Sequence, residues 1–185
     1  MSENIADNLL LVDYVLNVLN GEPFIKYQLD SIYPYANKII IVEGAYRKYS
    51  YAAKNFRSKD NTLKIIKSFP DPEKKIKLIL KEKFYEDRLE MCNEFMKYIS
   101  GDIMWQIDAD EFYLEDTHIA IPRIFKSLPK LDQISFEFID YYRNFNLMIK
   151  GYPKNQNDVI RINRIVKGMY WGNQRPPTLF VKEKE

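Results

Sequence analysis

The sequence contains little cysteine and little net charge, and each shortage excludes a class of protein. Its one cysteine, Cys92, rules out internal disulfides and zinc sites built from several cysteines. The net charge is only +2, from 28 basic and 26 acidic residues, which gives no general case for a nucleic-acid partner. A single cysteine also fits a reducing compartment, so we expect a cytoplasmic protein.

Long hydrophobic runs are also missing. The longest apolar stretch, residues 9–19, is interrupted by Asp13 and Asn17 and is too short to span a bilayer. The N-terminal residues include Glu3 and Asp7 but no basic cluster, which is not typical of a secretory signal. We therefore expect no transmembrane segment, an expectation that does not exclude work at a membrane surface.

The chain does contain enough apolar residues for a substantial core. Hydrophobic residues make up 46% of its 185 positions and aromatic residues 15%. This length and composition predict one folded domain over residues 1–185.

The hydrophobic pattern predicts alternating strands and helices. Apolar or β-branched runs between turn residues predict strands at 14–19, 38–42, 63–69, 103–107, 133–139 and 159–166. Helical spacing predicts helices at 23–33, 85–100 and 119–128, the last in spite of Pro122, with Gly101 capping the second. Residues 75–83 fit either a strand or a helix, and residues 169–181 suggest a loop with one short strand. This order predicts an α/β fold with a mostly parallel central sheet flanked by helices.

An acidic cluster directly follows the apolar run at 103–107. It consists of Asp108, Asp110 and Glu111. The plain interpretation is a charged loop after a core strand. The alternative is a site for a hard divalent cation, because such ions prefer oxygen ligands and share them with substrate phosphates. We expect the chain to turn here, so that the carboxylates of Asp108 and Asp110 point at one cation.

Two other predicted strands also end in polar residues, at 19–20 and 43–44. In parallel sheets ligands bind outside the carboxyl ends of the strands. We therefore expect these two ends and the acidic cluster to meet at one edge of the sheet.

Four segments taken together resemble glycosyltransferases of the GT-A fold, close to family 2. Residues 18–32 resemble the family's first strand and helix, residues 38–44 its second strand, and residues 92–102 the helix that leads to its D-x-D signature, which is matched by residues 108–110. The segments occur in the family's order. Three positions depart from the usual residues: Gly21 stands in a turn where glutamate is commoner, Glu43 replaces an aspartate and Cys92 replaces an arginine.

The resemblance implies transfer of a sugar from a UDP- or GDP-sugar with Mn²⁺ or Mg²⁺ as cofactor. Residues 1–113 would form the nucleotide-binding half and residues 114–185 the half facing a sugar, lipid or protein acceptor. Asp110 would bind the metal, and Asp108 the ribose or a metal-bound water. Glu43 would accept from the nucleobase, the backbone near Asn20 would pass over the base and ribose, and Arg88 or Lys54 would contact the diphosphate.

An inverting transferase also needs a carboxylate that takes the proton of the acceptor hydroxyl. The candidates are Glu137, Asp140 and Asp158, with Asp140 preferred because it follows a predicted strand. A late histidine often binds the metal in this family. Here Asn173 or Gln174 falls at that place, and we expect the only histidine, His118, to be structural.

Several interpretations stay open for the remaining basic residues and for the activity. The late arginines either clamp the diphosphate or lie on a solvated surface: Arg161, Arg164 and Arg175. A nucleotidyltransferase is a competing class, although the turn at 20–22 lacks the basic glycine-rich loop typical of that class. A degenerate, non-catalytic binding module is the third hypothesis.

Overall fold

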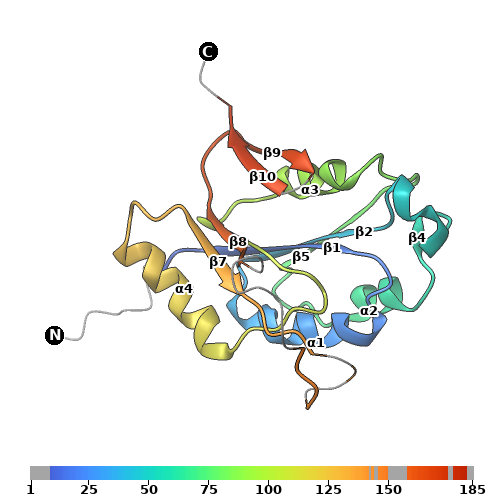
Figure 1. Ribbon diagram of the computed structural model, residues 1–185, viewed down its shortest axis with the longest axis horizontal. Helices are drawn as coiled ribbons and strands as arrows, with labels where there is room; N and C mark the ends of the chain where they lie inside the picture. The colour runs from blue at the N-terminus through green and yellow to red at the C-terminus, as the bar shows by residue number, and fades with distance from the viewer. Residues whose placement is uncertain (1–8, 142, 144–145, 150–157, 175–176, 183–185) are drawn as a thin grey trace.

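The computed structural model describes residues 9–141, 143, 146–149, 158–174 and 177–182. Its centre is a six-stranded sheet with the strand order β5-β2-β1-β6-β8-β7. Helices cover both faces of this sheet (Figure 1). The predicted α/β fold with a mostly parallel sheet is therefore confirmed. No helix among the described residues is both long enough and apolar enough to cross a membrane.

Four parallel strands form the part of the sheet that carries the site. Strand β1 (Val12–Val18) lies between β2 (Lys38–Glu43) and β6 (Ile103–Gln106), and β5 (Ile76–Leu80) pairs with the far side of β2. Burial on both faces explains why β2 is a continuous run of β-branched residues. Because β1, β2 and β6 are parallel, their carboxyl ends meet at one edge, as predicted.

Two further strands complete the sheet beyond β6. Strand β8 (Asp158–Arg164) is antiparallel to β6, and β7 (Gln133–Glu137) is antiparallel to β8. Strand β7 therefore runs in the same direction as β6. Its carboxyl end lies at the same edge of the sheet as the acidic cluster.

Three helices cover one face of the sheet, and their buried residues form the larger core. They are α1 (Glu22–Ile32), α2 (Thr62–Ser68) and α4 (Glu115–Ser127). This core includes Leu29 of α1 and Phe125 of α4, which are fully buried with Trp105 of β6. The alternating side chains of each strand explain the two cores, since residues on opposite faces reach different helices.

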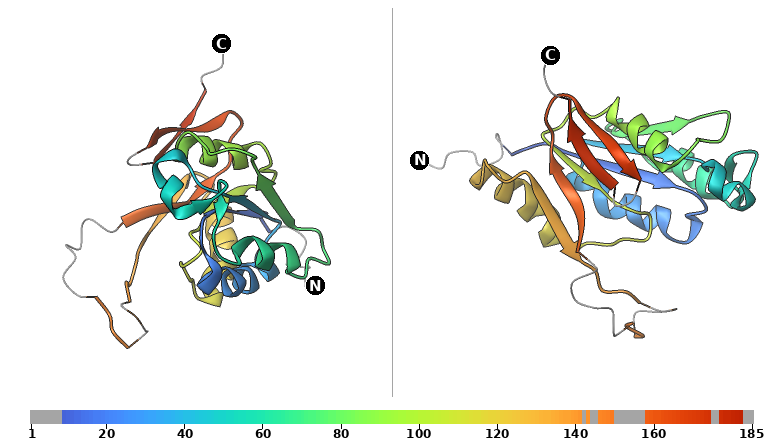
Figure 2. Two further views of the ribbon diagram at one scale, coloured as in Figure 1. Left: turned by 90° about the vertical axis from the view of Figure 1, so that its right-hand side faces the viewer. Right: turned by 45° about the horizontal axis from the view of Figure 1, so that its top comes forward.

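The other face carries α3 (Arg88–Met96) and a hairpin of β9 (Met169–Gln174) and β10 (Pro177–Val181). Figure 2 shows this hairpin on the same side of the sheet as α3. Phe95 of α3 and Trp171 of β9 belong to the second core, with Val15 and Met104 of the sheet. The chain also forms two 3-10 helices and a small ribbon: η2 (Tyr33–Tyr35), η3 (Arg47–Ala52), β3 (Ala53–Lys54) and β4 (Arg57–Ser58). Of these, η2 precedes β2 and the other three follow it.

Three sequence predictions were wrong. Residues 63–69 are not a strand, because α2 occupies them and its buried Thr62 and Ile66 show helical spacing. Residues 169–181 contain a hairpin of two strands instead of one short strand. Gly101 does not cap a helix, since α3 ends at Met96 with Lys97 as its cap.

Two of the other predicted helices are confirmed with shifted bounds. The helix expected at 85–100 starts only at Arg88, where the Asp87 side chain accepts a hydrogen bond from Glu90 N at 2.9 Å. The helix expected at 119–128 starts earlier, at Glu115, and contains Pro122 as expected. The ambiguous stretch at 75–83 contains a strand, β5.

Candidate functional site

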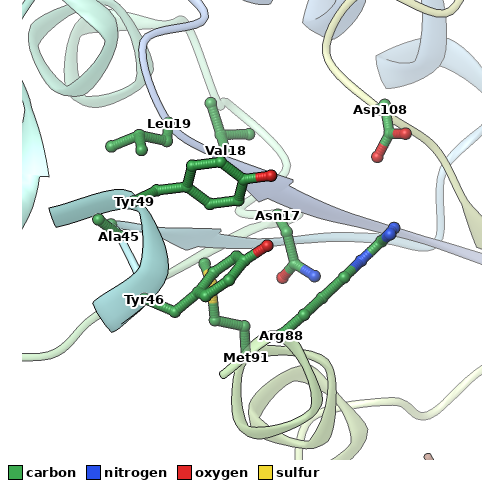
Figure 3. A pocket seen from close by; sticks show the side chains of 10 residues that line it. Asn17, Val18, Leu19, Ala45, Tyr46, Tyr49, Arg88, Met91 and Asp108 are labelled. Carbon is green, nitrogen blue, oxygen red and sulfur yellow. The ribbon is translucent and has the colours of Figure 1, made fainter. Parts of the chain in front are cut away.

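A cavity of about 270 Å³ opens at the carboxyl edge of the sheet, on the α3 side. The ends of β1 and β2, the helix η3, the start of α3 and the acidic cluster all contribute to its wall. The residues that line it are Asn17, Val18, Leu19, Gly44, Ala45, Tyr46, Tyr49, Arg88, Met91 and Asp108. Figure 3 shows most of these side chains around the cavity.

The acidic cluster lies on a tight turn that leaves the sheet directly after β6. Ile107 N still donates to Val15 O at 3.1 Å, so the strand direction is held up to that point. Glu111 N then donates to Asp108 O at 3.1 Å, which closes a turn over residues 108–111. The expected turn is present. Asp110 is exposed at its tip, while Asp108 is partly buried beside the cavity.

A buried arginine from β8 binds two of these acids. Arg161 Nη2 donates to Asp108 Oδ2 at 3.0 Å and to Glu111 Oε1. The arginine is 7% exposed, and the Phe138 ring centroid lies 5.5 Å from its Cζ. From the sequence, Arg161 was expected either to clamp the diphosphate or to lie on a solvated surface. The available signal was its place between Ile160 and Ile162, which indicates a strand of the core. A cation that is buried in such a strand needs a carboxylate partner.

The electrostatics of this cluster follow from burial and crowding. Burial and the nearby Asp108 charge raise the pKa of Glu111 to about 7, against the opposing effect of Arg161. Burial alone would lower the pKa of Arg161, but the charges of Asp108 and Glu111 outweigh it and raise that pKa. The guanidinium therefore stays charged and holds the two carboxylates together.

The donor atoms fit a divalent cation that is shared with a diphosphate. Asp108 and Asp110 offer hard carboxylate oxygens at a solvent-facing edge, and one or two carboxylates are enough for a cation whose other ligands are phosphates and water. In the described part of the chain, no group of three or more His, Cys, Asp or Glu side chains could hold a metal ion. Among the described residues these carboxylates do not form a closed protein cage, and a cation bound here would take its remaining ligands from phosphate or water.

Arg88 is the basic residue that reaches the cavity. It is the first residue of α3, and Figure 3 shows its side chain extending from that helix toward Asp108, past Asn17. Cys92 lies one helical turn further on and accepts a hydrogen bond from Asn17 Nδ2 at 3.1 Å. Burial raises the pKa of this cysteine, which suits a structural residue. Arg88 therefore stands on the helix face that Cys92 occupies, one turn before it.

Asn20 and Glu43 do not line the cavity. The Glu43 carboxylate is fully buried, accepts from Ser58 N at 2.7 Å and lies 3.6 Å from Arg57 Nη1. Asn20 has a positive φ of 55° and donates through Nδ2 to Ala52 O at 2.8 Å. Both residues hold the segment that carries η3, β3 and β4. In this conformation the Glu43 carboxylate has no exposed surface with which to contact a nucleobase.

The candidate catalytic carboxylates Glu137 and Asp140 are both exposed. Glu137 ends β7 and therefore lies at the same sheet edge as Asp108. Asp140 follows it by three residues, and Phe138 between them contacts Arg161. Asp158 pairs with Glu137 across the two strands, but its side chain lies outside the described residues.

The remaining candidates have mainly structural surroundings. His118 is buried, shares a 2.8 Å hydrogen bond through Nδ1 with the Tyr14 hydroxyl and stacks on Tyr35. This agrees with the structural role expected for it. Arg164 donates to the carbonyls of Leu131, Phe125 and Leu128. Lys54 and Asn173 are exposed, whereas Arg175 and the Gln174 side chain lie outside the described residues.

Comparison with solved structures identifies the architecture. Residues 1–349 of Staphylococcus aureus TarS match 84% of this chain with a TM-score of 0.58 at 14% identity. The mannosyltransferase PcManGT of Pyrobaculum calidifontis, solved with GDP-Man and Mn²⁺, matches 70% with a TM-score of 0.51 at 20% identity. The chain has the GT-A fold. Neither a known family model nor a curated protein matches the sequence.

The GT-A match covers only part of each neighbour. The chain spans 47% of the TarS fragment and 36% of PcManGT. A second TarS structure, in complex with UDP-GlcNAc, matches 78% of this chain and 37% of its own with a TM-score of 0.57 at 15% identity. The chain thus spans less than half of each of these neighbours.

Proposed function

We propose that this chain binds a nucleotide-diphosphate sugar together with Mn²⁺ or Mg²⁺ and transfers the sugar to an acceptor hydroxyl with inversion. The observation that carries this proposal is the acidic turn beside the cavity at the carboxyl edge of a GT-A sheet. Asp108 belongs to both the turn and the cavity wall, and Arg88 lines the same cavity. The proposed cation site and the arginine proposed to bind phosphate are thus adjacent, and this arrangement supports binding of a diphosphate.

The roles of the residues follow from the charge that develops in the reaction. The departing diphosphate gains negative charge, which a divalent cation neutralises as a Lewis acid when it is bound. Asp110 is exposed at the tip of the turn and is our metal ligand. Asp108 lies beside the cavity and contacts the ribose or a metal-bound water. Arg88 contacts the diphosphate with its planar guanidinium.

The acceptor hydroxyl loses a proton when it attacks the sugar, and a carboxylate must receive it. Asp140 is our candidate for this base, with Glu137 as the alternative. Two features support this choice: the exposure of both side chains and the common direction of β7 and β6.

Cation-dependent nucleotide binding tests the proposal directly. The wild-type protein is titrated with UDP and with GDP, each with and without Mn²⁺, by isothermal calorimetry. We expect one of the two to bind with Mn²⁺ and to bind poorly without it. Asp110→Asn should abolish this dependence and leave the fold intact, because the side chain is exposed.

The matched control is Asp132→Asn, an exposed acid at the opposite end of β7. It should leave nucleotide binding unchanged. Normal Mn²⁺-dependent binding in Asp110→Asn would refute the metal assignment. Binding of nucleoside triphosphates without preference for diphosphates would favour the nucleotidyltransferase. Binding without sugar hydrolysis or transfer for any donor tested would favour the non-catalytic module.

A further inference from the structure

Arg161 divides the three acids of the turn into two classes. Asp108 and Glu111 both accept hydrogen bonds from its Nη2, and the side chain of Arg161 is only 9% exposed. Asp110 is exposed and has no partner among the described residues. In the free protein, therefore, Asp110 is the unpaired carboxylate that faces solvent. Asp108 and Glu111 are already paired with Arg161.

We propose that Arg161 acts as an internal counter-cation that prevents Asp108 from binding a free divalent ion, so that the ion binds only together with the nucleotide diphosphate. Arg161 is thus a positioning residue that couples two ligands. This inference rests on the proposed function, because it assumes that the acidic turn is the cation site.

The first step of the argument is charge. A dication that approaches Asp108 meets a guanidinium 3.0 Å from the Oδ2 atom. The arginine cancels negative charge that would attract the ion and also repels the ion directly. The site is partly shielded from solvent, so this repulsion is weakened less than it would be on an open surface.

The second step is rigidity, because a mobile arginine could simply swing away. Arg161 is buried against the Phe138 ring and lies at the register shift between β7 and β8, next to a residue that is paired on both sides. The adjacent Ile162 pairs with Trp105 of β6 and with Ile134 of β7. The guanidinium is therefore fixed beside Asp108.

The third step is what the diphosphate adds. Its oxygens supply ligands that the turn lacks, and its negative charge offsets the repulsion from Arg161. Arg161 Nε is also buried without an acceptor in the described residues, so the cluster has an unused donor. Each ligand then raises the affinity of the other by the same factor, as linkage requires.

Mn²⁺ titrations without nucleotide test the inference, with free Mn²⁺ followed by its paramagnetic resonance signal. Arg161→Met should bind Mn²⁺ alone about tenfold more tightly than wild type, because the opposing charge is gone. Arg161→Lys, which keeps the charge, should restore the weak binding of wild type. Arg164→Met is the matched control on the same strand and should not change Mn²⁺ affinity, since the hydrogen bonds of Arg164 go to main-chain carbonyls and its guanidinium lies over the Phe125 ring. Unchanged Mn²⁺ affinity in folded Arg161→Met would overturn the inference.

A second measurement needs no variant and remains decisive if Arg161→Met fails to fold. Wild-type Mn²⁺ affinity is compared with and without a saturating concentration of UDP or GDP. We expect it to be about tenfold or more higher with the nucleotide. Equal affinity in the presence of a bound nucleotide would contradict the coupling. If neither nucleotide binds to wild type at any Mn²⁺ concentration, the proposed function fails, while the nucleotide-free titrations still decide the role of Arg161.

Discussion

The Tyr14 hydroxyl and His118 Nδ1 share a hydrogen bond of 2.8 Å, and this bond joins β1 to α4 inside the larger core. Burial lowers the pKa of His118 to about 4. Four aromatic rings surround the imidazole: Tyr14, Tyr35, Trp105 and Tyr113.

This relationship predicts a loss of stability in acid. The unfolded chain binds a proton at His118 with the ordinary pKa of 6.5, whereas the folded chain does so only near 4. Stability from this residue is therefore complete above pH 6.5 and falls as the pH drops toward 4, by on the order of 2 kcal/mol. Urea unfolding between pH 4 and pH 7 measures the slope. His118→Phe should flatten it, and an equal slope in that variant would contradict the prediction.

The same residue allows a direct check. His118 is the only histidine, so its imidazole resonances need no assignment. We expect them to stay constant from pH 8 down to about 5, because the folded-state pKa lies below that range. A midpoint near 6.5 would show that the ring is solvated.

Asn93 attaches the β9–β10 hairpin to α3. Its side chain donates to Trp171 O and accepts from Trp171 N, both at 2.9 Å. Asn93→Ala should cost about 2 kcal/mol, since it removes two hydrogen bonds from a buried main chain. Hydrogen exchange of the β9 amides should accelerate. The control is Asn173→Ala, an exposed position on the same strand, which should leave that exchange unchanged.

Gly101 is required for the close approach of two backbone segments. A Cβ atom at this position would lie 2.7 Å from Leu11 O, which cannot move away cheaply. Gly101→Ala should therefore destabilise the protein by about 1–3 kcal/mol, measured by chemical unfolding. Gly172→Ala serves as the comparison. The nearest neighbours of a Cβ there are all atoms of the Phe180 ring, which is 38% exposed and stacks on Tyr170; a side chain yields more easily than backbone, so the cost should be smaller.

Arg88→Ala should weaken Mn²⁺-dependent nucleotide binding by about tenfold or more, because a charged hydrogen bond to phosphate is lost. Arg88→Lys should recover part of this loss, since lysine keeps the charge without the planar fork. Calorimetric titration measures both variants. Arg123→Ala, an exposed arginine on α4, is the control. Unchanged affinity in Arg88→Ala would remove this residue from the donor site.

Local signals were sufficient to predict the parallel core of the sheet. The run at Lys38–Glu43 is buried on both faces and contains almost only β-branched residues, so its strand is visible in the sequence. The acids after β6 were also visible in the sequence, because they directly follow the apolar run at 103–107. Helix α2 was missed because its apolar residues fit a strand pattern as well as a helix, and only its packing against the sheet decides between the two.

The partner of the acidic turn could not be predicted, because it depends on topology. Arg161 is 53 residues from Asp108 in sequence and reaches it only because β8 pairs with β6. For Glu43, the sequence indicated the right position in the sheet but not the burial of its side chain. Its position at a strand end was predicted correctly, but the burial of its carboxylate depends on the backbone of Ser58 in the following ribbon.

The position of β8 between β6 and β7 affects how the chain unfolds. A fragment that ends near residue 113 would lose the strand that covers the open side of β6, and its acids would repel one another without their shared guanidinium. Residues 1–113 and residues 114–185 are therefore expected to unfold in one cooperative step. Neither is expected to persist as an autonomous folding unit.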